Sequence, residues 1–123
     1  MTFDWSDYLD FAEEVSRKNS ATEAEVRSAI SRTYYSVHNL ASASTPKSGK
    51  VEINNSHRNL VSRYKFDKIN TNYQEAGKIL GGLKRDRHTA DYDSDSSKLG
   101  QNLNKKLQSV ILQAKEFKRL ADL

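Results

Sequence analysis

The chain has 123 residues, a net charge of +4 and no cysteine, with 36% hydrophobic and 29% charged residues. This length suits one domain around one hydrophobic core, so residues 1–123 are treated as a single domain. The lack of cysteine excludes disulfides, thiolate catalysis and cysteine-ligated zinc. The chain has neither a signal-like N-terminus nor about 18 consecutive apolar residues, so we expect a cytoplasmic protein that does not enter a membrane.

Charge is distributed unevenly along the chain. Residues 1–26 carry seven acids and two bases, a net of −5, whereas residues 27–123 carry 18 bases and nine acids, a net of +9. A basic body is typical of nucleic-acid binders. Scattered lysines that only aid solubility are an alternative, and the acidic N-terminal segment could instead cover part of the basic body.

Apolar residues recur at helical spacing, and no segment alternates as a strand would. A first helix is predicted over 5–18, capped by Asp4. A second is predicted over 22–42, where Thr22 and Glu25 form a capping-box pattern. The apolar faces of these two helices consist of Trp5, Tyr8, Leu9, Ala12 and Val15, and of Val26, Ile30, Tyr34, Val37 and Ala41.

Residues 42–55 contain the only proline and few apolar residues, so a flexible loop is predicted there. A third helix is expected over 56–69 with His57, Leu60, Val61 and Tyr64 inward. Thr71 and Gln74 form a second capping pattern before a helix over 73–90. The last helix, over 96–122, carries one apolar stripe: Leu99, Leu103, Leu107, Val110, Ala114, Phe117 and Ala121.

Together these segments predict an all-α fold, a four- or five-helix antiparallel up-and-down bundle. Gly81 and Gly82 lie inside the fourth helix, where each costs up to about 1 kcal/mol relative to alanine. Three explanations stay open: a kink, the close approach of another backbone (including that of a second subunit), or a break between two shorter helices.

Arg87 lies on the inward stripe of the fourth helix, with Tyr73, Ala76, Leu80, Leu83 and Ala90. A buried guanidinium needs acceptors, and Asp91, one turn on, is the nearest candidate. With Tyr34 and His57 on the facing stripes, these residues predict a polar cluster. The cluster either fixes the helix packing through hydrogen bonds or contacts a phosphate.

Two segments resemble the HEPN superfamily. Residues 27–38 read RSAISRTYYSVH, similar to a signature helix with an arginine followed by a tyrosine pair, and residues 83–93 read LKRDRHTADYD, similar to its arginine-rich stretch ending in Ala-Asp-Tyr. The residues that carry this resemblance, and that we consider candidates for the site, are Arg32, Tyr34, Tyr35, His38, Arg85, Arg87, Asp91 and Tyr92.

The resemblance implies a helical bundle, often a homodimer, found in toxin–antitoxin and phage-defence systems beside a nucleotidyltransferase-type antitoxin. Many relatives are metal-independent ribonucleases whose catalytic arginine precedes a histidine by four to six intervening residues. In this chain four intervening residues after Arg87 lead to Tyr92, not to a histidine. Arg32 and His38 have the required spacing but lie about 120° apart around a helix.

If the chain cleaves RNA, the 2′-hydroxyl attacks the adjacent phosphate while Arg87 stabilises the developing charge. The proton carrier is then His57, His38 or Tyr92. Tyr34, Tyr35, Arg85 and Asp91 are expected to bind RNA or to structure the site.

No metal or cofactor is expected, because the histidines lack ligand spacing and no glycine-rich phosphate loop occurs. Three functions stay open. The chain is a toxin or phage-defence effector acting on RNA, a catalytically inactive module that binds RNA, nucleotide or a partner protein, or a structural subunit of an assembly.

Overall fold

A computed structural model describes residues 2–44 and 57–123, the side chains of residues 57–59 excepted. The described residues form five α-helices and one 3₁₀ helix, without a strand, so the all-α prediction is confirmed. The elements are α1 (Ser6–Ser16), α2 (Glu23–Ser44), α3 (His57–Lys65), α4 (Thr71–Tyr92), η1 (Ser96–Leu99) and α5 (Leu103–Leu120).

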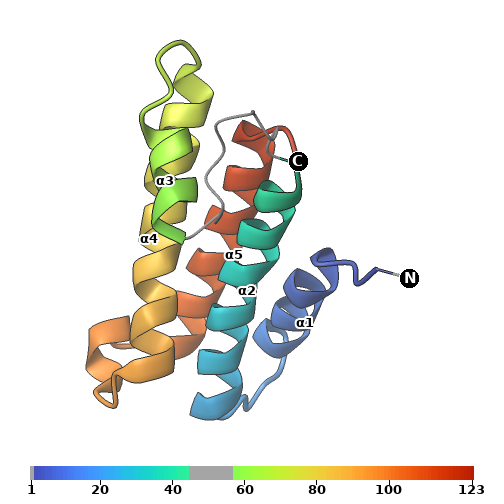
Figure 1. The fold of residues 1–123 in the computed structure, drawn as a ribbon. Helices are drawn as coiled ribbons and strands as arrows, with labels where there is room; N and C mark the ends of the chain where they lie inside the picture. The colour runs from blue at the N-terminus through green and yellow to red at the C-terminus, as the bar shows by residue number, and fades with distance from the viewer. Residues whose placement is uncertain (1, 45–56) are drawn as a thin grey trace.

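The helices form a bundle with α2 and α5 side by side at its centre (Figure 1). The α1 helix packs on α2 and α5, and α3 packs chiefly on α4. Consecutive helices run antiparallel in the pairs α1–α2, α3–α4 and α4–α5, whereas α2 and α3 run in the same direction (Figure 1). The end of α2 and the end of α4 therefore lie at opposite ends of the bundle.

The core is built from the apolar stripes of all five helices, as helical periodicity predicts. The largest fully buried side chains come mainly from α2, α4 and α5: Ile30, Tyr34, Val37, Leu80, Leu83, Leu107, Val110 and Phe117. Leu99 of η1 and Leu60 of α3 complete this core. Because the stripes of α2 and α4 face each other, any polar residue on either stripe is placed inside the bundle.

The start of α2 forms as predicted, whereas two other predicted caps are wrong. Glu25 donates its backbone N–H to Thr22 Oγ1 over 3.1 Å, and Thr22 N–H donates to Glu25 Oε1 over 3.0 Å. The N-cap of α1 is Trp5 and not Asp4, which instead accepts from the backbone of Ser6. At α4 the cap is Asn70, because its backbone is extended and its side chain accepts from the fourth residue of the turn.

Two predicted helix extents also differ from the structure. The helix predicted over 96–122 is interrupted at Gly100, whose φ of 106° is open to glycine and strained for other residues. Asn102 then caps a new helix by accepting from Lys105 N–H. The third helix ends at Lys65, because the Asp67 carboxylate accepts two backbone N–H groups and forms a turn. Residues 42–44 of the predicted loop are helical, and its remainder lies outside the described residues.

The glycine pair at 81 and 82 does not break the fourth helix, because α4 continues through both residues. The close approach of another backbone occurs one turn earlier, at Gly77. A Cβ added to Gly77 would lie 2.2 Å from the backbone nitrogen of Lys65. A Cβ added to Gly81 or Gly82 would make only ordinary packing contacts, at 3.6 Å or more. Gly77 is therefore what lets α3 pack closely on α4.

The acidic N-terminal helix covers part of the basic body, the alternative raised by the charge distribution. Glu13 of α1 forms an ion pair with Lys115 of α5. Among the described residues, no helix combines the length and the apolar character that crossing a membrane requires.

Candidate functional site

The predicted inward arginine lies inside the bundle. Arg87 is 9% exposed, and its guanidinium carbon lies 5.6 Å from the ring centre of Tyr34 and 5.5 Å from that of Tyr35. Tyr92, one turn further along α4, is 6.0 Å away. A cation within about 6 Å of aromatic rings is stabilised by their electron-rich faces. Three tyrosines thus replace much of the hydration that burial removes from Arg87.

Asp91 is the acceptor predicted for Arg87. Their closest nitrogen and oxygen atoms are 3.6 Å apart, which is an ion pair and longer than a good hydrogen bond. The same Asp91 oxygen accepts from the Ser31 hydroxyl over 3.1 Å, which ties α4 to α2. Arg87 Nε is buried and has no hydrogen-bond partner among the described residues. Arg87 is therefore held by the tyrosine rings and Asp91 rather than by a full set of hydrogen bonds.

Tyr34 and His38 form the buried side of this cluster. The Tyr34 hydroxyl lies 3.4 Å from His38 Nδ1, and both residues are buried in α2. Burial raises the pKa of the Tyr34 hydroxyl far above its usual value. Tyr34 therefore stays protonated near neutral pH, and its ring and hydroxyl serve to position Arg87 and His38.

A basic cavity of about 510 Å³ lies between α3 and α4, and we call it the α3–α4 cavity. Four cationic side chains line it, Lys65, Lys84, Arg85 and Arg87, together with His88. No acidic side chain is among the described residues that line it. Like charges gathered in one hollow repel each other and raise the local concentration of anions. The cavity is therefore suited to bind phosphate groups.

A second cavity, of about 530 Å³, lies over the outer face of α2 between α1 and the end of α4, and we call it the α1–α2 cavity. Its aromatic wall consists of Trp5, Tyr8 and Tyr35, and its charged groups are Arg32 and Asp91. The two cavities meet at the Arg87–Asp91 pair, because Arg87 lines the first and Asp91 the second.

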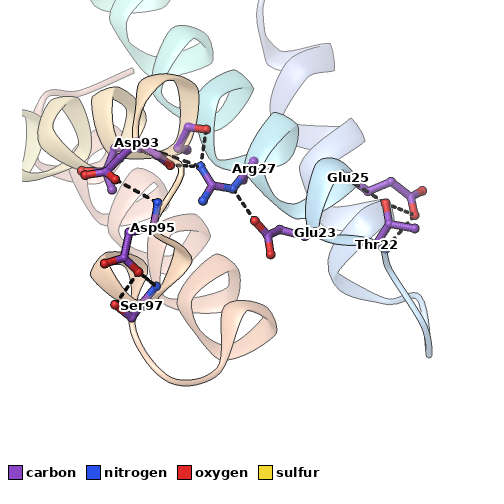
Figure 2. A network of polar contacts seen from close by, with 9 residues as sticks. Thr22, Glu23, Glu25, Arg27, Asp93, Asp95 and Ser97 are labelled. Atoms are coloured by element: carbon purple, nitrogen blue, oxygen red, sulfur yellow. Dashed lines mark hydrogen bonds and ion pairs between the residues drawn. The ribbon is translucent and has the colours of Figure 1, made fainter.

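The end of α4 that carries Asp91 and Tyr92 is held by Arg27 of α2 (Figure 2). Arg27 Nη1 donates to the carbonyl oxygens of Ala90 over 3.0 Å and Asp93 over 2.6 Å, and more weakly to that of Thr89. The last carbonyls of a helix have no partner within the helix, so this side chain satisfies them. Sequence reasoning placed Arg27 in the signature segment but missed this role.

Replacing Arg27 by methionine is expected to lower the free energy of unfolding by about 1.5–3 kcal/mol, the usual contribution of hydrogen bonds to a charged donor. Glu23, which accepts from Arg27 Nε on the surface, provides the control. Glu23→Gln should cost at most about 0.5 kcal/mol, because exposed ion pairs contribute little. Urea denaturation measures both changes. Equal, small losses would contradict the capping role.

The structure brings together five of the predicted site residues: Tyr34, Tyr35, Arg87, Asp91 and Tyr92. Arg85 lies on the α3–α4 cavity. Arg32 is exposed on the α1–α2 cavity, where its guanidinium carbon lies 5.1 Å from the ring centre of Tyr8. His38 is 6% exposed and lines neither cavity. The side chain of His57 lies outside the described residues.

Sequence reasoning missed three residues of the α3–α4 cavity: Lys65, Lys84 and His88. The signal for two of them was present, since 81, 84, 85 and 88 follow helical spacing and form one face of α4. Attention to the apolar stripe alone hides such a polar face. Lys65 comes from another helix, so its proximity depends on the packing of α3.

Within residues 2–44 and 57–123, no group of three or more histidine, aspartate or glutamate side chains is placed to hold a metal ion. Comparisons with protein-family models, curated proteins and solved structures find no match to this chain. The geometry of the chain itself is therefore the basis for its functional interpretation.

Proposed function

We propose that this chain is a HEPN-type domain that acts on RNA, and that it binds RNA phosphates in the α3–α4 cavity. The observation that carries the proposal is the concentration of Lys65, Lys84, Arg85 and Arg87 around one hollow that no acidic side chain lines within residues 2–44 and 60–123. Arginine and lysine contacts to phosphates supply most of the sequence-independent affinity for nucleic acids. The resemblance to HEPN effectors of toxin–antitoxin and phage-defence systems supports the same substrate.

Single-stranded RNA fits this surface better than a duplex. Phe66, on the cavity wall, is 70% exposed, and Tyr92, beside Arg87, is 71% exposed. Exposed aromatic rings next to cations are the usual means by which proteins stack unpaired bases while holding the backbone.

Cleavage of the bound RNA is the second part of the proposal, and the neighbourhood of Arg87, His88 and Tyr92 favours it. The rings of His88 and Tyr92 are 5.0 Å apart. In the reaction the 2′-oxygen bonds to phosphorus, the bond to the 5′-oxygen breaks, and a cyclic phosphate and a 5′-hydroxyl result. Arg87 would stabilise the negative phosphorane, while His88 or Tyr92 would move the proton from the 2′-oxygen to the leaving oxygen.

The binding proposal is tested by comparing two double variants. One removes two charges that line the α3–α4 cavity, and the other removes two charges that lie elsewhere on the surface. Lys84→Ala with Arg85→Ala should weaken binding of a fluorescent single-stranded RNA about tenfold, measured by anisotropy. The slope of log affinity against log salt should fall by about 1.4, since each phosphate contact to a single strand contributes about 0.7. Lys78 and Lys105 are exposed and line neither cavity.

Changing Lys78 and Lys105 to alanine removes the same charge and should leave affinity nearly unchanged. Equal weakening by both pairs would show that binding follows net charge alone and would refute the α3–α4 cavity as the site. If the wild-type protein binds no RNA at low salt, the function itself is wrong, and partner docking or a structural role takes its place.

A further inference from the structure

The α1–α2 cavity has chemistry that phosphate binding does not use. Its wall offers the rings of Trp5, Tyr8 and Tyr35, and its polar groups include Asn39 and Asp91. Its volume of about 530 Å³ is within the usual range for a small-molecule site. Aromatic walls with a few fixed polar groups are how proteins bind a single unstacked base.

Asp91 supplies a carboxylate with free acceptor capacity. The Ser31 hydroxyl and the Arg87 guanidinium both contact Oδ2. No described residue donates to Oδ1, although the residue sits on the cavity wall. The carboxylate is held in place because Arg27 fixes the end of α4 only a few atoms away. It is therefore a preorganised acceptor pair rather than a mobile surface acid.

Donors are present in the same cavity. The Asn39 amide has no hydrogen bond to another described residue, and it lines the cavity two turns along α2 from Arg32. Arg32 lies across α1, with its guanidinium carbon 5.1 Å and 5.2 Å from the ring centres of Tyr8 and Phe11, and its Nε donates to Ser28. Its two terminal nitrogens have no acceptor among the described residues.

The four RNA bases differ in how well their donors and acceptors match these groups. Guanine presents two adjacent donors, N1–H and the 2-amino group, which match the two oxygens of a carboxylate. Adenine and cytosine each present one amino donor beside a ring acceptor, which would face the carboxylate unfavourably. Uracil presents a single N–H between two carbonyl oxygens, and these would repel Asp91. The Asn39 amide, about two turns of α2 away from Ser31, can donate to guanine N7 at the far side of the base.

We propose that the α1–α2 cavity binds a guanine base of the RNA strand whose phosphate lies at Arg87. The guanine would stack on the aromatic wall with its Watson–Crick edge on Asp91. This inference rests on the proposed function, because it makes the second cavity a specificity subsite of the same RNA. The contact between Arg87 and Asp91 places the two subsites one beside the other, as neighbouring nucleotides require.

The test uses the full chain and labelled uridine decamers that carry one central guanosine, adenosine or cytidine. The guanosine oligomer should bind roughly fivefold to tenfold more tightly than the other two, the range for one bidentate base contact at a partly open site. Asp91→Asn replaces one acceptor by a donor and should abolish this preference. Asn39 lines the cavity away from Arg87, and Asn39→Leu should reduce the preference about threefold. Thermal unfolding checks that both variants fold.

The outcomes separate the two proposals. Binding of all three oligomers with equal affinity would overturn the guanine subsite and leave RNA binding in place. A preference that survives Asp91→Asn in a folded protein would also overturn it. If no oligomer binds, the proposed function fails, and guanosine monophosphate is then the probe: its binding, lost in Asp91→Asn, would support the cavity alone, and its failure to bind would refute it.

Discussion

Replacing Arg87 by methionine is expected to lower RNA affinity by about tenfold to a hundredfold while the fold remains as stable as that of the wild type. The loss reflects a charged group that donates to phosphate, a contribution of about 1.5–3 kcal/mol. Stability should be largely preserved, because methionine keeps the apolar contact with Tyr34 and Tyr35, and because Asp91, the partner that loses its ion pair, is partly exposed to solvent. Fluorescence anisotropy and urea denaturation measure the two effects separately.

Methionine is preferable to alanine at this position. Alanine would leave a hollow beside Tyr34 and Tyr35, and a loss of binding could then follow from unfolding. Asp91, the partner left behind, keeps its bond from Ser31 and is 29% exposed, so it is not stranded in the core. If Arg87→Met unfolds the protein, the cluster exists to hold the helices together, and the structural interpretation of Arg87 is the correct one.

The same variant decides whether the chain is an enzyme. Labelled RNA is incubated in EDTA with the wild-type protein and with Arg87→Met. Fragments that end in a cyclic phosphate with the wild type alone would establish a metal-independent ribonuclease. RNA that is bound and stays intact with both proteins would establish the binding module. That alternative is favoured because Tyr92 stands four intervening residues after Arg87, where the resembled motif has a histidine.

Gly77→Ala is expected to cost about 3 kcal/mol or more, a large part of the 5–15 kcal/mol that stabilises a typical domain. The added methyl group would lie 2.2 Å from the Lys65 backbone nitrogen, so α3 would have to move away from α4. Backbone cannot change rotamer to escape the overlap. Because both helices line the α3–α4 cavity, any Gly77→Ala protein that still folds should also bind RNA less tightly.

Gly82→Ala is the matched control, since it makes the same chemical change in the same helix. Its nearest contact outside the local backbone would be Arg85 Nη2 at 3.7 Å, which is ordinary packing. Alanine has the higher helix propensity, so this variant should be stabilised by about 0.5–1 kcal/mol. Urea midpoints that shift in the same direction for both variants would contradict the close approach of α3 and α4 at Gly77.

Much of the central cluster could be predicted because it depends on local periodicity. The alternation of three and four along α4 puts Arg87 on the same stripe as Leu80 and Leu83, and the structure confirms that it is buried. Asp91 had to be its nearest acceptor, since residues four apart are neighbours on a helix surface. The same spacing argument, applied to α2, predicts that Tyr34 faces the core.

The helix ends were predicted less well, because several adjacent residues can cap a helix. Asp4, Thr71 and Asn70 all carry suitable oxygens, and backbone angles decide between them. The break at Gly100 depended on one φ value that glycine permits and the apolar stripe conceals. Arg27 could not be predicted as a cap for α4, since the carbonyls that it binds are more than 60 residues away.

The sequence by itself determined the class of fold, the composition of the core and the inward direction of Arg87, since these depend on spacing within single helices. Only the tertiary structure decided which surfaces meet: that Gly77 admits α3, that Lys65 joins the α4 cations, and that Asp91 lies between two cavities. Spacing places residues around one axis, whereas packing, which depends on shape at every contact between helices, places the axes relative to one another.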